Sequence, residues 1–207
     1  MQRNTPAAGG SGSPRGARRP SRSRYAARVS ESPTFVWIDL EMTGLDVERC
    51  AIVEIGLVIT KGDLVPLAEL ERVVWQPDEV LARMDPFVRE MHEKSGLLER
   101  VRASKTSLAD AEREALALVL RHCGPREGIL SGNSVHTDRR FLARYMPVLE
   151  GLLHYRQLDV SSLKVLASAW APELPRFEKG EKTHTAIADQ RGSLAELAYY
   201  REKLFRV

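Results

Sequence analysis

Two carboxylates stand two residues apart in the stretch FVWIDLEMTGL, residues 35 to 45, where an apolar run ends just before a glycine. Because successive side chains of a strand point to opposite faces, Asp39 and Glu41 project from the same face of a predicted strand. Two like charges this close repel each other. Either both are solvated turn residues, or a divalent cation, which takes oxygen ligands, lies between them. The pair alone leaves both interpretations open.

A histidine and an aspartate form a second candidate pair in the stretch HTAIAD. In one continuous helix, His184 and Asp189 would lie about 140° apart. We therefore expect His184 just before the helix, with Thr183 or Thr185 as the N-cap. Asp189 then lies one turn inside and points toward the sheet beside Ala186, whose small side chain allows close approach. A capping histidine and a surface aspartate remain the alternative.

A third acidic residue, Asp138 in GNSVHTDRRFL, stands at the predicted start of a helix that follows a short strand. An aspartate in a first helical turn can simply interact with the helix dipole. The order along the chain is more informative than any one signal. It runs from Asp-x-Glu on the first strand, through Asp on a middle helix, to His-x-Ala-x-x-Asp at the last helix.

The elements that must position these residues follow an α/β pattern. Three strands joined by short turns predict an antiparallel meander, and the alternating helices and strands that follow predict a mixed sheet flanked by helices. This is the plan of ribonuclease-H-like nucleases, here with five strands. The predicted strands cover residues 35–40, 51–60, 64–76, 128–133 and 155–160. The predicted helices cover residues 78–102 (broken at Pro86 and Gly96), 107–124, 137–146, 161–170 and 185–204.

Length and charge separate a basic tail from one domain. The 207 residues, 43% hydrophobic and 29% charged, suit one compact domain. Residues 1–30 hold seven of the 31 basic residues and no acidic one, so the remainder has 24 basic against 28 acidic residues and a net charge of −4. We predict a disordered basic tail over residues 1–32 and one folded domain over 33–207, to which the motif resemblance described below assigns exonuclease activity. An organellar transit peptide is the alternative for the tail.

Cysteine usage and hydropathy favour a soluble protein of the cytoplasm. Cys50 and Cys123 lie far apart with no CxxC spacing, which argues against a disulfide framework or a structural zinc site. Glu54 interrupts the most apolar run, AIVEIGLVIT, and no run approaches the ~20 residues of a membrane-spanning helix.

The ordered acidic set resembles the DEDDh group of 3′-to-5′ exonucleases, and the flanking residues resemble the oligoribonuclease family. The resemblance rests on WIDLEMTGLD, IVEI, SGLLERV, GNS with DRRFL and YMP, HYRQLDVS and LAELAYYRE. It runs from about Phe35 to the C-terminus. It implies cleavage of short oligoribonucleotides, dinucleotides above all, to nucleoside 5′-monophosphates, including linear products of cyclic dinucleotide signals.

The resemblance also implies a two-metal mechanism. Asp39, Glu41, Asp138 and Asp189 would hold two Mg²⁺ or Mn²⁺ ions roughly 3.5–4 Å apart, with Asp39 bridging both. Clustered cations suit a phosphodiester, whose oxygens carry the negative charge. His184, with an ordinary pKa near 6.5, would be the general base that takes a proton from the attacking water.

Further residues would bind the substrate in a homodimer, by the same resemblance. Leu45 would wedge between the two bases, with Met42 and Trp37 nearby, and His92 would lie near the substrate. The alternative for Trp37 is a purely structural role in the hydrophobic core. The residues of a cap on the 5′-phosphate would be Ser134, Tyr155, Arg156 and Ser161, with Tyr155 supplied by the partner subunit. The negative charge of the domain suits a short substrate, which needs few phosphate contacts.

Departures from the family pattern are confined to the final helix. Ala188 stands where a second acid is usual, and Gln190 and Gly192 replace commoner residues. They bear on helix stability and metal affinity rather than on the reaction. Two other interpretations remain: a related exonuclease that acts on DNA or longer RNA, and a module that binds RNA or dinucleotides without turnover.

Overall fold

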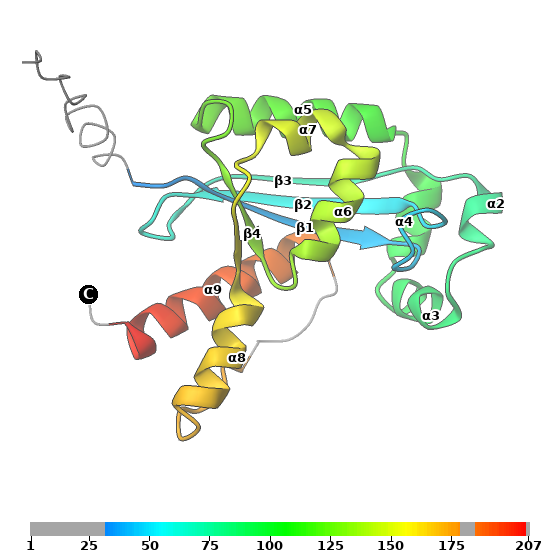
Figure 1. Ribbon diagram of the computed structural model, residues 1–207. Helices are drawn as coiled ribbons and strands as arrows, with labels where there is room; N and C mark the ends of the chain where they lie inside the picture. Colours follow the sequence, from blue (N-terminus) through cyan, green and yellow to red (C-terminus); the bar gives the residue numbers. More distant parts are fainter. Residues whose placement is uncertain (1–31, 179–184, 206–207) are drawn as a thin grey trace, which may run out of the picture. The chain divides into compact units, whose positions relative to one another are not determined.

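The computed structural model describes residues 32–178 and 185–205. The predicted tail, apart from Ser32, lies outside the described residues, as does His184. The described chain contains a five-stranded mixed sheet flanked by helices, which confirms the predicted fold class (Figure 1). Its strands are β1 (Phe35–Met42), β2 (Ile52–Thr60), β3 (Pro66–Val73), β4 (Ile129–Gly132) and β5 (Gln157–Asp159).

Strand order in the sheet is β3-β2-β1-β4-β5. The first three strands pair antiparallel, as the predicted meander requires, whereas β1, β4 and β5 pair parallel. β1 is therefore the central strand, with hydrogen-bonded neighbours on both sides. A residue on a central strand has little freedom to move, which suits a strand that carries the Asp39 and Glu41 side chains.

The helices follow the predicted breaks. Asp85 caps the helix that begins at Pro86, and Gly96 adopts a left-handed φ of 72° between two helices. Ser107 accepts a hydrogen bond from the Asp110 amide, as its Ser-x-x-Asp pattern predicts. The helices are α2 (Asp78–Leu81), α3 (Pro86–Lys94), α4 (Leu97–Ala103), α5 (Leu108–His122), α6 (His136–Tyr145), α7 (Pro147–Leu152), α8 (Val160–Trp170) and α9 (Ala186–Leu204). Of these, α7 was not predicted.

Two apolar clusters cover the two faces of the sheet. α5 and α7 lie over one face, and α9 crosses the other (Figure 1). Val36, Ile38 and Leu40 of β1 pack into the cluster formed with α5, α6 and α7. Trp37 of the same strand packs on the opposite face, with residues of α8 and α9. The alternation along β1 therefore directs Asp39 and Glu41 toward the face that α9 covers.

The structure also describes the two cysteines and the length and hydropathy of the helices. Cys50 and Cys123 are both free thiols. Among the helices of residues 32–178 and 185–205, none is long and apolar enough to cross a membrane.

Candidate active site

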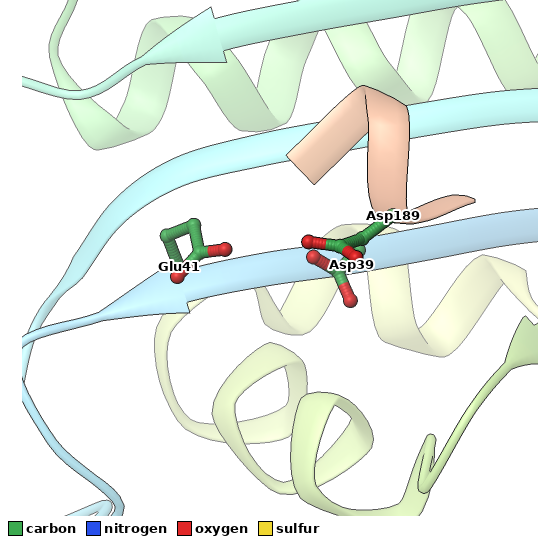
Figure 2. A group of neighbouring side chains, drawn as sticks. All are labelled: Asp39, Glu41 and Asp189. Carbon is green, nitrogen blue, oxygen red and sulfur yellow. The ribbon is translucent and has the colours of Figure 1, made fainter. Parts of the chain in front are cut away.

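Three carboxylates meet between the central strand and the start of the last helix. Asp39 and Glu41 from β1 and Asp189 from α9 each place an oxygen so that these oxygens all lie within 4.8 Å of one another. Figure 2 shows the three side chains directed toward a common point, with Asp189 approaching from α9. The structure thus brings together two of the acidic signals that lie about 150 residues apart in the sequence.

The start of α9 determines where Asp189 lies. Thr185 is the N-cap, and its hydroxyl oxygen accepts a hydrogen bond from the Ala188 amide. The Asp189 amide donates to the Thr185 carbonyl at 3.1 Å, so Asp189 lies in the first turn. Of the two threonines predicted as caps, Thr185 is therefore confirmed. Ala186 is fully buried against the sheet, as its small side chain predicts.

Asp138 is tied directly to the strand that carries the other acids. It lies in the first turn of α6 and is buried, and its Oδ1 accepts a hydrogen bond from the Leu40 amide at 3.0 Å. Leu40 is the residue between Asp39 and Glu41. Burial raises the pKa of Asp138 to about 7, against the opposing effect of the Leu40 hydrogen bond. Asp138 therefore does more than interact with the helix dipole, because the amide of a residue 98 positions away in the sequence donates a hydrogen bond to its side chain.

The electrostatics of the cluster favour a cation. Burial raises the pKa of Glu41 to about 8, and the negative charges of Asp189, Glu54 and Asp138 add to the shift. Because the ionised form of Glu41 is unfavourable here, a cation bound beside it would stabilise that form strongly. The donor set consists of hard carboxylate oxygens, which is the set that Mg²⁺ and Mn²⁺ take in proteins. The residues present therefore fit divalent metal ions.

His92 and Met42 lie beside the cluster. The His92 ring is buried, and its Nε2 donates to the Met42 carbonyl oxygen at 3.0 Å, while Glu41 Oε2 lies 4.0 Å away. Burial lowers the pKa of His92, and the hydrogen bond to the Met42 carbonyl, which raises the pKa, only partly offsets this. A neutral His92 therefore holds the end of β1 and faces Glu41.

Leu45 and Trp37 differ in how they are placed. Leu45 follows Gly44 in a turn and leaves 70% of its surface exposed, so it is available to a ligand. Trp37 is 0% exposed, and its indole Nε1 donates to Thr60 Oγ1 at 3.0 Å. Its full burial favours the core interpretation of Trp37 over a role against substrate.

Two of the predicted cap residues, Ser134 and Ser161, are joined by hydrogen bonds. The Ser134 amide donates to Asp159 Oδ1 at 2.9 Å and to Ser161 Oγ at 3.0 Å. The Ser161 hydroxyl in turn donates to Asn133 Oδ1 at 3.0 Å. Ser134 has a left-handed φ of 52°, which this amide bonding helps to hold.

The other two cap residues, Tyr155 and Arg156, form a separate exposed pair before β5. Tyr155 is 67% exposed and stacks on His154, with ring centroids 4.5 Å apart. The Arg156 guanidinium lies 5.3 Å from the Tyr155 ring centroid, a cation–π distance. Both side chains are presented to solvent.

Comparison with known proteins adds evidence from outside the chain. The sequence matches the family model described as "Exonuclease" over residues 36–197, most of its length. It is 50% identical over 179 residues to an oligoribonuclease of Pseudomonas syringae pv. tomato, an alignment that covers 86% of this chain and 99% of the relative.

The chain belongs to the oligoribonuclease family of exonucleases.

As a family member it is a nuclease, and nucleases of the exonuclease family need divalent metal ions. A second oligoribonuclease, from Pseudomonas paraeruginosa, is 47% identical over 173 residues, covering 83% of this chain and 96% of the relative. The predicted resemblance is thereby confirmed.

Solved structures support the fold of the family. Exonuclease I of E. coli in complex with an oligonucleotide matches with a TM-score of 0.64 at 16% identity, over 84% of this chain and 42% of the other. Exonuclease I of Methylocaldum szegediense matches with a TM-score of 0.62, also at 16% identity, over 83% of this chain and 41% of the other. The chain thus spans about two fifths of the length of these exonuclease I chains. At this identity the likeness shows the ribonuclease-H-like fold.

Sequence reasoning missed several residues that support the family's site. Asp159 and Asn133 hold the two cap serines, and a buried Glu54 contacts the start of α9. Glu54 has a visible signal, a charge within an otherwise apolar strand and within the family-like stretch IVEI, but neither feature predicts its contact with α9. Asn133 and Asp159 lie in the family-like stretches GNS and HYRQLDVS, but no spacing predicts their contacts with Ser161 and Ser134, which are 28 and 25 residues away.

Proposed function

We propose that this family member is a 3′-to-5′ exoribonuclease that degrades short oligoribonucleotides, dinucleotides above all, to nucleoside 5′-monophosphates. The observation that carries the proposal is the carboxylate cluster of Asp39, Glu41 and Asp189, with Asp138 bonded to the same strand. Oligoribonuclease relatives that align over nearly their whole length support the choice of RNA.

The four acids, Asp39, Glu41, Asp138 and Asp189, would hold two Mg²⁺ or Mn²⁺ ions. Such ions activate water and stabilise the leaving oxygen of a phosphodiester. Burial keeps bulk water from screening the charges of Glu41 and Asp138, so these carboxylates bind a cation more strongly than exposed ones would. The β1 backbone and the first turns of α6 and α9 fix their positions before substrate arrives.

His184 is proposed as the general base. It stands two residues before the first residue of α9 and five before Asp189, but it lies outside the described residues. A neutral imidazole there would accept a proton from the attacking water as the water oxygen bonds to phosphorus. The bond from phosphorus to the 3′ oxygen of the preceding nucleotide breaks, that oxygen takes up a proton to become a hydroxyl, and the released nucleotide keeps the phosphate on its 5′ oxygen.

The length preference is proposed to come from a cap on the 5′ end of the substrate. Ser134 and Ser161 supply hydroxyl groups, and Arg156 supplies an exposed cation for charge-assisted bonds to a phosphate. Leu45, exposed at the turn after β1, would lie between the two bases. Met42 and His92 would support that turn, since His92 bonds the Met42 carbonyl. A closed 5′ end leaves room for only a few nucleotides.

A homodimer completes the proposal. Tyr155 is exposed, stacks on His154 and lies within cation–π distance of Arg156, a placement that suits contact with a second subunit. The domain of residues 33–207 would carry the activity, and the basic tail of residues 1–32 would be dispensable. We place the protein in the cytoplasm, in keeping with its two free cysteines. Linear dinucleotides made from cyclic signals would be among its substrates.

A length series tests this function. Purified protein with Mg²⁺ or Mn²⁺ is given 5′-phosphorylated RNAs from two to about ten nucleotides long, and the initial rate is measured for each. The proposal predicts fastest cleavage of the dinucleotide and a steep fall with length. Flat or rising rates would favour an exonuclease of longer strands, and the absence of cleavage at every length would favour a binding module.

A further inference from the structure

Glu54 is a buried charge that the proposed mechanism does not use. It lies within β2, all of whose residues are buried, and its side chain is 0% exposed. In the sheet it pairs directly with Glu41. A buried carboxylate is costly unless charged and hydrogen-bonded partners surround it. The contacts of Glu54 must therefore offset the cost of burying a carboxylate beside the acidic cluster.

Both carboxylate oxygens of Glu54 have partners from distant parts of the chain. Oε1 accepts a hydrogen bond from Arg100 Nη2 of α4 at 2.7 Å. Oε2 accepts one from the Ala186 amide at 3.0 Å. Ala186 is the first residue of α9, and its amide is one of the helix-start donors that have no partner inside the helix. Thr185 satisfies a different one, the Ala188 amide.

Gly56, two residues further along β2, lets α9 come close enough for this contact. A Cβ at Gly56 would lie 2.5 Å from the Ala186 carbonyl carbon and 2.6 Å from the Ile187 nitrogen, so only glycine fits. Gly56 is also the residue that pairs with Asp39. β2 therefore both admits the start of α9 over the sheet and bonds to it, one turn before Asp189.

From these contacts we infer that Glu54 is a positioning residue, whose reach to the Ala186 amide sets the place of Asp189 relative to Asp39 and so the affinity for divalent ions. The inference rests on the metal site proposed above. On this account the reach of the side chain matters to the site, whereas its charge serves mainly to bond Arg100. A partner beyond the ligands themselves changes metal affinity by about 10- to 100-fold when it is removed.

Two substitutions separate reach from charge. Glu54→Gln keeps an oxygen that can accept from Ala186 but removes the charge, and Glu54→Asp keeps the charge but is one methylene too short for the amide. Mn²⁺ binding is measured by isothermal titration calorimetry, together with hydrogen exchange of the Ala186 amide. We expect Glu54→Asp to weaken Mn²⁺ binding by at least about 10-fold and to speed exchange. We expect Glu54→Gln to stay within about threefold of the wild type on both readouts.

Glu69→Gln is the matched control. Glu69 of β3 accepts hydrogen bonds from Nε and Nη2 of Arg191, an exposed residue in the second turn of α9, and makes no contact with the Ala186 amide, which Glu54 binds. Breaking this contact loosens α9 without touching the Ala186 amide, so Mn²⁺ affinity should be unaltered. Equal effects of Glu69→Gln and Glu54→Asp would show a general loss of helix packing and overturn the inference. So would equal effects of Glu54→Gln and Glu54→Asp.

Arg100→Gln is the second variant if Glu54→Asp does not fold. It removes the ion pair and leaves the bond from Ala186 to Glu54, so Mn²⁺ affinity should stay within about threefold of the wild type even if the melting temperature falls. A loss of affinity of 10-fold or more in Arg100→Gln would overturn the inference. The two proposals fail differently: wild-type protein that binds no Mn²⁺ refutes the metal site, whereas wild-type binding with an unaltered Glu54→Asp refutes only the role of Glu54.

Discussion

The acidic cluster and the proposed 5′-phosphate cap are built in opposite ways. Asp39, Glu41 and Asp189 project from a central strand and a helix start into a partly buried space. The cap places Tyr155 and Arg156 in solvent, ahead of a strand of three residues. The cluster holds like charges together before a counter-charge arrives, whereas the cap holds donors that water already solvates. The first arrangement suits catalysis and the second suits recognition, so substitutions in the two regions should affect different kinetic constants.

Loss of one charge in the cluster should have the largest effect. In Asp138→Asn the amide oxygen can still accept from the Leu40 amide, so the fold should persist. Without the carboxylate, the rate of dinucleotide hydrolysis should fall by about 1,000-fold. The measurement is the initial rate at saturating Mg²⁺, with circular dichroism to verify folding. Asp110→Asn, at the equivalent first turn of α5 on the face of the sheet opposite α9, is the control and should keep the wild-type rate. An active Asp138→Asn would refute the role of Asp138.

A substitution in the cap should change binding rather than turnover. Arg156→Ala removes a charge-assisted bond to phosphate, a loss that corresponds to roughly 10- to 100-fold in KM. This increase is expected for a 5′-phosphorylated dinucleotide and not for one with a 5′-hydroxyl. Arg144→Ala is the matched control, because Arg144 is also exposed and lies over a tyrosine ring, at 5.6 Å. An equal increase in KM for both dinucleotides would show that Arg156 does not bind the 5′-phosphate.

A smaller effect should appear in the stability of the metal-free protein. Burial raises the pKa of Glu41 from 4.5 to about 8, so the folded chain binds this proton more tightly than the unfolded chain does. The resulting stabilisation is complete below the unfolded value and is lost as pH rises to about 8. In EDTA, the melting temperature of the wild type minus that of Glu41→Gln should therefore fall as the pH rises from about 5 to about 8. Added Mg²⁺ should reverse this trend, and a difference that rises with pH would contradict it.

Removal of the tail should have the smallest effect. A chain that lacks residues 1–31 keeps Ser32, whose Oγ accepts a hydrogen bond from the Gly62 amide. Its kcat/KM for a dinucleotide should stay within about twofold of the full chain. A larger loss would mean that the basic tail takes part in substrate binding.

Much of the fold could be predicted because the signals were local. Pro86 and Gly96 break helices through their own backbone preferences, and Ser107 and Thr185 cap helices through bonds to residues three positions away. Helix α7 was missed because PVLEGL is short and holds both a proline and a glycine. Its stability comes instead from packing in the cluster with α5 and α6.

The acids of the site could be predicted as a set, but their support could not. Strand alternation was enough to place Asp39 and Glu41 on one face. The hydrogen bond that the Ala186 amide donates to Glu54 joins residues 132 positions apart, and no local pattern encodes such a contact. The burial of Trp37 likewise depends on α8 and α9 packing over it. Sequence patterns therefore identified the candidate ligands, and the three-dimensional structure shows which contacts hold their side chains in place.

The most direct test of the central claim is a calorimetric titration of the wild type and of Asp39→Asn with Mn²⁺. The carboxylate cluster predicts two ions bound per chain in the wild type and the loss of both in Asp39→Asn, with the fold retained by circular dichroism. Binding of two ions by Asp39→Asn with unaltered affinity would show that the metal centre lies elsewhere in the protein.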